Sequence, residues 1–157
     1  MTRAADSDYE IERKYLLRGM PRLPDGVRVL RIDQGWIPGR RLKERLRRTR
    51  EGDRITYHRT VKLGSGLKRL EIEEETTAAV FRALWRLTLG KRIRKLRYVV
   101  QDGGTWEIDR FIGLQLVLAE IELGSEEEAV YIPDWLAAVV DREVTGDIRY
   151  TNYSLAR

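Results

Sequence analysis

The chain has 157 residues, of which 42% are apolar and 35% are charged, with 30 Lys and Arg against 25 Asp and Glu. This length and apolar content fit one globular domain with its own core and exclude general disorder. The absence of cysteine excludes disulfides, thiolate nucleophiles and cysteine-based metal sites. A single histidine, His58, excludes multi-histidine zinc sites. Carboxylates, basic side chains and a hard metal ion remain as the possible catalytic groups.

The N-terminal segment lacks the apolar stretch of a signal peptide, and no apolar run is long enough to span a membrane. Because the lack of cysteine also suits a reducing compartment, we expect a cytoplasmic protein without a membrane partner. Basic residues alternate with acidic residues on neighbouring predicted strands, whereas a surface that follows a nucleic-acid backbone is mainly positive. We therefore expect no specific nucleic-acid partner, and the oligomeric state stays open.

Alternation of polar and apolar residues predicts eight strands, at 9–17, 27–37, 41–50, 54–62, 68–75, 91–101, 105–111 and 114–123. Glycine-containing turns at 51–53 and 102–104 predict two hairpins. Most connections between the strands are short, which favours antiparallel pairing over parallel pairing.

Helical spacing of apolar residues predicts one clear helix, which ends near Leu89. Thr76 or Thr77 is its expected N-cap, and Gly90 is a suitable C-terminal stop. A second, short helix is predicted at 133–140. The tail from Val144 onward has weak patterning and yields no prediction of its structure.

Most strands carry charged residues two positions apart, and such residues point to the same face of a strand. The pairs are Glu10 and Glu12, Arg45 and Arg47, Glu71 and Glu73, Lys95 and Arg97, Glu107 and Asp109, and Glu120 and Glu122. One interpretation is a sheet whose solvated face carries cross-strand salt bridges. The other is a closed antiparallel barrel with a charged lumen and with outward apolar residues, namely Ile11, Leu46, Ile72, Ile108 and Ile121. A lumen of mixed sign suits an anionic ligand carried with Mg²⁺ or Mn²⁺.

The segment Glu10-Ile11-Glu12-Arg13-Lys14 resembles the ExExK signature of the CYTH superfamily, the triphosphate tunnel metalloenzymes. Later segments resemble the other strands of that family in order: Arg45-Leu46-Arg47, Thr60-Val61-Lys62, Glu71-Ile72-Glu73-Glu74-Glu75, Lys95-Leu96-Arg97-Tyr98, Trp106-Glu107-Ile108-Asp109, Glu120-Ile121-Glu122 and the C-terminal Arg149-Tyr150-Thr151-Asn152 through Leu155-Ala156. The resemblance covers residues 1–157 as one CYTH-like domain. It implies a mainly β (α+β) fold, a closed eight-stranded antiparallel barrel that forms a tunnel, with a few helices packed outside.

The same resemblance implies metal-dependent hydrolysis of a linear triphosphate, because family members act on triphosphates with a divalent metal ion. The short chain resembles the small bacterial inorganic triphosphatases, so inorganic tripolyphosphate is the expected substrate. Three alternatives stay open: a class IV-type adenylate cyclase, a thiamine or nucleoside triphosphatase, and a non-catalytic polyphosphate- or nucleotide-binding protein. The absence of an early His-Phe dipeptide weakens the cyclase alternative.

Site residues follow from the same matched motifs. The implied phosphate-binding residues are Lys14, Arg45, Arg47, Lys62, Lys95 and Arg97. The implied ligands of Mg²⁺ or Mn²⁺ are Glu10, Glu12, Glu73, Glu120 and Glu122, with Glu71, Glu75, Glu107 and Asp109 as further tunnel candidates. Catalytic roles are expected for Glu10, Glu12 and Lys14, and either glutamate could orient the attacking water.

Overall fold

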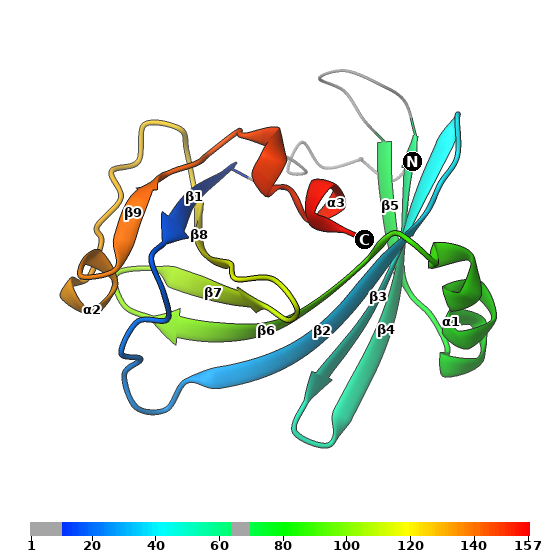
Figure 1. The fold of residues 1–157 in the computed structure, drawn as a ribbon, viewed down its shortest axis with the longest axis horizontal. Coiled ribbons are helices and arrows are strands. Elements are labelled where there is room, and N and C mark those ends of the chain that lie inside the picture. The colour runs from blue at the N-terminus through cyan, green and yellow to red at the C-terminus, as the bar shows by residue number, and fades with distance from the viewer. Residues whose placement is uncertain (1–10, 64–69) are drawn as a thin grey trace, which may run out of the picture.

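The computed structural model describes residues 11–63 and 70–157, apart from the side chains of residues 62, 63, 70 and 71. Nine strands form one antiparallel sheet in the order β5-β4-β3-β2-β6-β7-β8-β1-β9. The sheet curls so that it has a concave and a convex face (Figure 1). The strands are β1 (Ile11–Leu17), β2 (Arg28–Ile37), β3 (Leu42–Glu51), β4 (Arg54–Leu63), β5 (Leu70–Glu75), β6 (Arg92–Gln101), β7 (Thr105–Phe111), β8 (Val117–Leu123) and β9 (Val140–Glu143).

The mainly antiparallel β class is confirmed, but the prediction of a closed eight-stranded barrel is wrong. Within the described residues, β5 pairs only with β4, and β9 pairs only with β1, so the sheet has two open edges. The sequence prediction did not contain β9, which occupies the edge of β1 that closure would require. The C-terminal segment then lies on the concave side, where Tyr150 and Asn152 contact Lys14 and Lys95.

The predicted helix after β5 is confirmed as α1 (Ala78–Trp85), followed by the 3₁₀ turn η1 (Arg86–Thr88). Thr77 caps α1, because its hydroxyl accepts a hydrogen bond from the backbone N–H of Val80 at 3.2 Å. The turn η1 packs directly on β2 at Gly35, where a Cβ atom would lie 2.7 Å from Thr88. A glycine at position 35 therefore permits this close contact on the convex face.

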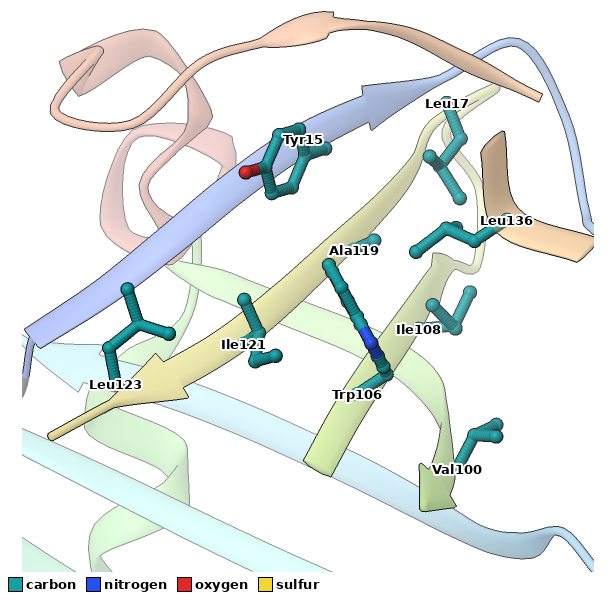
Figure 2. Packing of buried hydrophobic residues seen from close by; sticks show 9 residues of the cluster. All are labelled: Tyr15, Leu17, Val100, Trp106, Ile108, Ala119, Ile121, Leu123 and Leu136. Atoms are coloured by element: carbon teal, nitrogen blue, oxygen red, sulfur yellow. The ribbon is translucent and has the colours of Figure 1, made fainter. Parts of the chain in front are cut away.

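Two apolar clusters flank the charged residues of the sheet. The first lies on the convex face beneath α2 (Asp134–Ala137) and contains Tyr15, Leu17, Val100, Trp106, Ile108, Ala119, Ile121, Leu123 and Leu136 (Figure 2). Leu46, Ile108 and Ile121 are buried, which agrees with their predicted outward packing. Ile72 lies on the edge strand β5 and is 49% exposed, because no further element covers that edge among the described residues.

The second apolar cluster, here called the concave cluster, contains Trp36, Ile93, Phe111, Leu118, Val144 and Ala156. Its strand residues share the face of the charged pairs, since Ile93 and Lys95 are two positions apart in β6. The 3₁₀ turn η2 (Ile148–Tyr150) and α3 (Asn152–Leu155) bring Tyr150 and Leu155 against it. The unpatterned tail thus completes the core of the concave side. None of the described helices has the length and apolar character needed to cross a membrane.

Candidate active site

Charged side chains of six strands meet in a cavity of about 410 Å³ on the concave face. The antiparallel register brings them together, because Lys14 lies directly opposite Glu120, and Glu120 lies opposite Glu107. The lining residues are Glu12, Lys14, Arg45, Arg47, Glu73, Arg97, Thr105, Glu107, Glu120, Glu122 and Asn152. Nine of these eleven residues are charged, and eight of the nine belong to the pairs that the alternation assigned to one face.

The remaining predicted site residues lie at different depths. Lys95 and Asp109 lie below the cavity surface, with side chains 1% and 0% exposed. Glu75 is exposed in β5, opposite His58 of β4, and does not line the cavity. Glu10 lies outside the described residues. Lys62 and Glu71 face each other in the β4–β5 ladder, but their side chains are not described.

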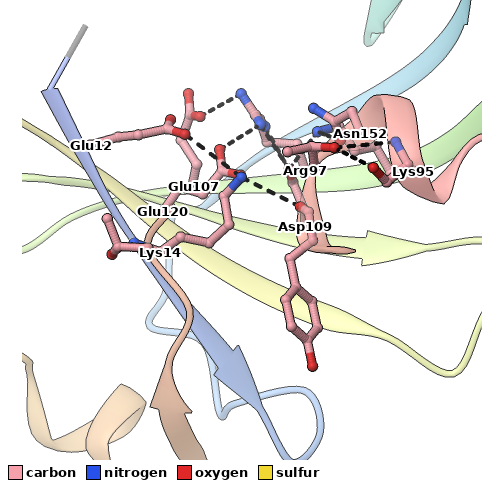
Figure 3. A network of polar contacts seen from close by, with 12 residues as sticks. Glu12, Lys14, Lys95, Arg97, Glu107, Asp109, Glu120 and Asn152 are labelled. Atoms are coloured by element: carbon pink, nitrogen blue, oxygen red, sulfur yellow. Dashed lines mark hydrogen bonds and ion pairs between the residues drawn. The ribbon is translucent and has the colours of Figure 1, made fainter. Parts of the chain in front are cut away.

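Arg97 occupies the centre of a dense ionic network (Figure 3). Its Nε and Nη2 atoms both donate to Asp109 at 2.7 Å, in a two-pronged contact. The guanidinium also pairs with Glu107, and with Glu120 at 3.4 Å. Burial opposes the charge of Arg97, but the three carboxylates outweigh burial and raise its pKa. The positive charge of Arg97 is therefore balanced by carboxylates of the protein itself.

Asp109 anchors two cations at the base of the cavity. Besides the contact to Arg97, it accepts a hydrogen bond from the Lys95 ammonium at 2.5 Å. Burial raises the pKa of Asp109, but Lys95 and Arg97 outweigh burial and lower it to about 2. Lys95 also donates to Asn152 of the C-terminal segment at 3.2 Å. The contacts of Lys95 thus support the cavity from below.

Arg47 has a different environment from Arg97. Its Nε atom donates to the side-chain oxygen of Gln34 at 3.0 Å, and no carboxylate among the described side chains forms an ion pair with it. Burial and the positive charges of Arg45 and Arg97 lower the pKa of Arg47 to about 10, so it stays protonated at neutral pH. A largely buried cation without a counter-ion is unfavourable, and a bound anion relieves that cost.

Arg45 and Lys14 flank the cavity with partly compensated charges. Arg45 donates to Thr60 at 3.0 Å and to Glu73 at 2.8 Å. Lys14 lies 3.1 Å from a carboxylate oxygen of Glu120 and 3.6 Å from one of Glu12. Both basic side chains are only about one-eighth exposed, at 15% and 12%. They reach the same cavity as Arg47, so several cations can contact one polyanion.

The opposite wall of the cavity is acidic. Glu12 lies directly opposite Glu122 in the β1–β8 ladder, and such facing like charges destabilise a sheet. Burial raises the pKa of Glu107, and the charges of Asp109 and Glu120 add to this effect against that of Arg97. Among the described residues no three carboxylates converge into a metal site made by the protein alone. Mg²⁺ commonly uses one or two carboxylates together with phosphate oxygens and waters, and the facing glutamates fit that mode.

No protein-family model matches the chain. An inorganic triphosphatase of Nitrosomonas europaea is 36% identical over 154 residues, which cover 94% of this chain and 96% of that protein. An inorganic triphosphatase of Acetivibrio thermocellus is 37% identical over 155 residues, which cover 94% and 93% of the two chains. The chain belongs to the inorganic triphosphatase family.

A solved structure agrees with this membership. The crystal structure of the inorganic triphosphatase NE1496 matches with a TM-score of 0.68 at 34% identity, over 94% of each chain. A protein of Pyrococcus horikoshii, PH1819, matches with a TM-score of 0.50 at 21% identity, over 76% of this chain and 80% of that one, which shows a shared fold alone.

In this member of the inorganic triphosphatase family, three residues of the site were missed by sequence reasoning. Thr105 and Asn152 line the cavity, and Gln34 holds Arg47. Gln34 lies two positions before Trp36 in β2, so strand alternation could have placed it on the inner face. Strand alternation gave no signal for Asn152, and the family resemblance named its segment without assigning it a role in the site.

Proposed function

We propose that this chain hydrolyses a linear triphosphate, with inorganic tripolyphosphate as its substrate, as a member of the CYTH superfamily. The observation that carries this proposal is Arg47, which is largely buried and has no counter-ion among the described side chains. It shares a cavity of about 410 Å³ with Arg45, Arg97 and Lys14. The names of the two curated relatives support the same reaction. We further propose that the protein is cytoplasmic, which agrees with its lack of cysteine.

The basic residues would bind the substrate through its phosphate oxygens. Arg47 and Arg45 would each present a guanidinium, whose planar N–H groups match the spacing of phosphate oxygens. Lys14 and Arg97 would add charge beside the acidic wall. Lys95 supports the site from below through Asp109 in the present arrangement, and Lys62 remains a predicted phosphate ligand.

The acidic wall would hold Mg²⁺ or Mn²⁺. Glu12 and Glu122 face each other and would share one ion, with Glu120, Glu73 and the undescribed Glu10 as further predicted ligands. When bound, such an ion would offset phosphate charge and favour ionisation of a water. Glu12 or Glu10 would orient the attacking water toward the terminal phosphorus.

In the reaction, the water oxygen forms a bond to the terminal phosphorus, and the bond to the bridging oxygen breaks. The products are orthophosphate and pyrophosphate. Arg47 and Arg45 would stabilise the charge that develops on the phosphate oxygens in the transition state. The carboxylates would accept the proton that the water releases.

A substrate panel tests the proposal. Tripolyphosphate, pyrophosphate, ATP, GTP and thiamine triphosphate are each incubated with Mg²⁺ or Mn²⁺, and released phosphate is measured. We expect the fastest release from tripolyphosphate, and we expect Arg48→Ala, a convex-face change, to leave it unaltered. Tight binding of tripolyphosphate without release would instead indicate a binding protein. Formation of cyclic AMP from ATP would indicate a cyclase.

A further inference from the structure

Gln34 is a fully buried polar residue directly opposite Arg47 in the β2–β3 ladder. Its side-chain oxygen accepts the Arg47 Nε hydrogen at 3.0 Å. An arginine Nε can only donate, so the amide must turn its oxygen toward Arg47 and its nitrogen away. Within the described part of the chain, that buried amide nitrogen has no hydrogen-bond partner. Among the described side chains, the site therefore keeps an unsatisfied donor next to a cation that no carboxylate pairs with.

The other cations of the cavity use carboxylates as acceptors. Arg97 pairs with Asp109, and Lys14 pairs with Glu120. A glutamate at position 34 would have nearly the size of glutamine and would accept the same hydrogen bond. It would also cancel the charge of Arg47, which the neutral amide does not. The amide thus fixes the direction of the guanidinium without compensating its charge.

We infer that Gln34 is a positioning residue, which holds Arg47 by its Nε and leaves the N–H groups of Nη1 and Nη2 and the full charge to a substrate phosphate. This inference rests on the proposed function for the identity of the anion. The arrangement of Gln34 and Arg47 itself does not depend on it.

The test is Gln34→Glu, which changes one charge at nearly constant shape. We expect the KM for tripolyphosphate to rise roughly tenfold or more, because a charge-assisted contact is weakened. In the absence of triphosphate we expect a higher melting temperature, because Arg47 gains a carboxylate partner. These opposite directions distinguish positioning from a structural role, in which binding and stability would fall together. In an Arg47→Ala background, Gln34→Glu should no longer raise the melting temperature.

Two further variants complete the test. Gln34→Met keeps the approximate shape but removes the acceptor, so we expect a smaller rise in KM than for Gln34→Glu and no gain in stability. Gln115→Glu adds the same charge on an exposed loop and should change neither KM nor melting temperature. A wild-type KM in Gln34→Glu, or a lower melting temperature of the free variant, would overturn the inference.

The activity assay tests the proposed function, and the melting temperatures test the inference about Gln34, so failure of one can be told from failure of the other. A wild-type protein that hydrolyses no triphosphate would contradict the proposed function. The melts without triphosphate would still decide whether Gln34 leaves the charge of Arg47 uncompensated. Calorimetric titration with sodium tripolyphosphate would then replace KM as the measure of anion binding.

Discussion

Arg47 and Arg97 lie in the same cavity, yet their environments shift their pKa values in opposite directions. The pKa of Arg97 is raised by three carboxylates that outweigh burial, whereas burial and two neighbouring arginines lower the pKa of Arg47 to about 10. Arg97 is part of the folded architecture, because its charge is already compensated. Arg47 depends on a ligand for that compensation, since no described carboxylate pairs with it.

The convex face of the sheet also carries buried charge, but there the arginines have a carboxylate partner in Asp33. Asp33 is buried there and accepts hydrogen bonds from Arg48 at 2.8 Å and from Arg94 at 2.7 Å. Burial raises the pKa of Asp33, but these two arginines outweigh it and lower the pKa. Both faces are rich in charge, so charge density alone does not identify the binding face. Asp33 compensates the two arginines that it contacts, whereas Arg47, which lines the concave cavity beside Arg45 and Arg97, has no carboxylate partner among the described side chains.

The largest effect is expected when the partner of Arg97 is removed. Asp109→Asn should leave Arg97 and Lys95 under-compensated and should destabilise the fold by about 3–5 kcal/mol, as measured by urea unfolding. The native-state pKa of Asp109 is about 2, below the 3.8 of an ordinary aspartate, so its stabilising effect exists above pH 4 and is lost as the pH falls toward 2. The variant should lose this acid dependence. An unfolding midpoint equal to wild type would contradict the assigned role.

Removal of the metal should abolish most turnover without unfolding the protein. EDTA should stop phosphate release, and Glu12→Gln or Glu122→Gln should raise the Mg²⁺ or Mn²⁺ concentration that gives half-maximal rate. Each substitution also relieves a pair of facing carboxylates, so the melting temperature of the free protein should stay constant or rise. Full activity of both variants in EDTA would exclude a catalytic metal at this wall.

Arg47→Ala should lower the activity with little effect on the stability of the free protein. Loss of a charge-assisted phosphate contact costs about 1.5–3 kcal/mol, which corresponds to roughly a tenfold to hundredfold loss in kcat/KM. The stability of the free protein should fall little or rise, because the loss of a like-charged neighbour of Arg45 and Arg97 offsets the loss of the hydrogen bond to Gln34. Arg47→Lys should recover only part of the activity. If Arg47→Ala unfolds the protein while the folded fraction turns over normally, Arg47 is a structural residue.

The smallest effect is expected for a matched ion pair at the surface. Arg28 contacts Glu51 through the same two-pronged geometry that Arg97 makes with Asp109, at 2.7 and 2.9 Å. Both side chains are exposed, at 60% and 40%, so solvent and salt screen the pair. Glu51→Gln should leave turnover unchanged and move the urea midpoint far less than Asp109→Asn. Equal shifts would show that burial does not set the strength of this contact.

Strand alternation predicted much of the cavity from the sequence, because a period of two places residues such as Arg45 and Arg47 on one face whatever the sheet's final shape. Local helical spacing and capping signals likewise predicted α1, and they limited its cap to Thr76 or Thr77, of which the structure has Thr77. These features depend on neighbours within a few residues.

The features that sequence reasoning missed depend on distant contacts. Closure of the sheet was predicted from the family resemblance, but β9 pairs with β1 at the edge where closure would occur. The C-terminal tail contacts Lys95 of β6. Asn152 reaches Lys95 only through the fold, 57 positions away. The alternation placed Lys95 among residues of the inner face, but it carries no information on depth, and Lys95 lies below the cavity surface. Proposed roles for Lys62, Glu71 and Glu10 remain predictions.

The pairing of β1 has a consequence for how the protein is made. The ladder partner of Leu17 is Val117, so a ribosome must add about a hundred residues, in roughly 5 to 20 s, before the first strand can find that neighbour. During that interval Tyr15, Leu16 and Leu17 have no partner strand to cover them. A nascent chain stalled before β8 should therefore be sensitive to proteases and prone to aggregate. Bacterial expression at lower temperature should improve the yield of the full-length folded protein.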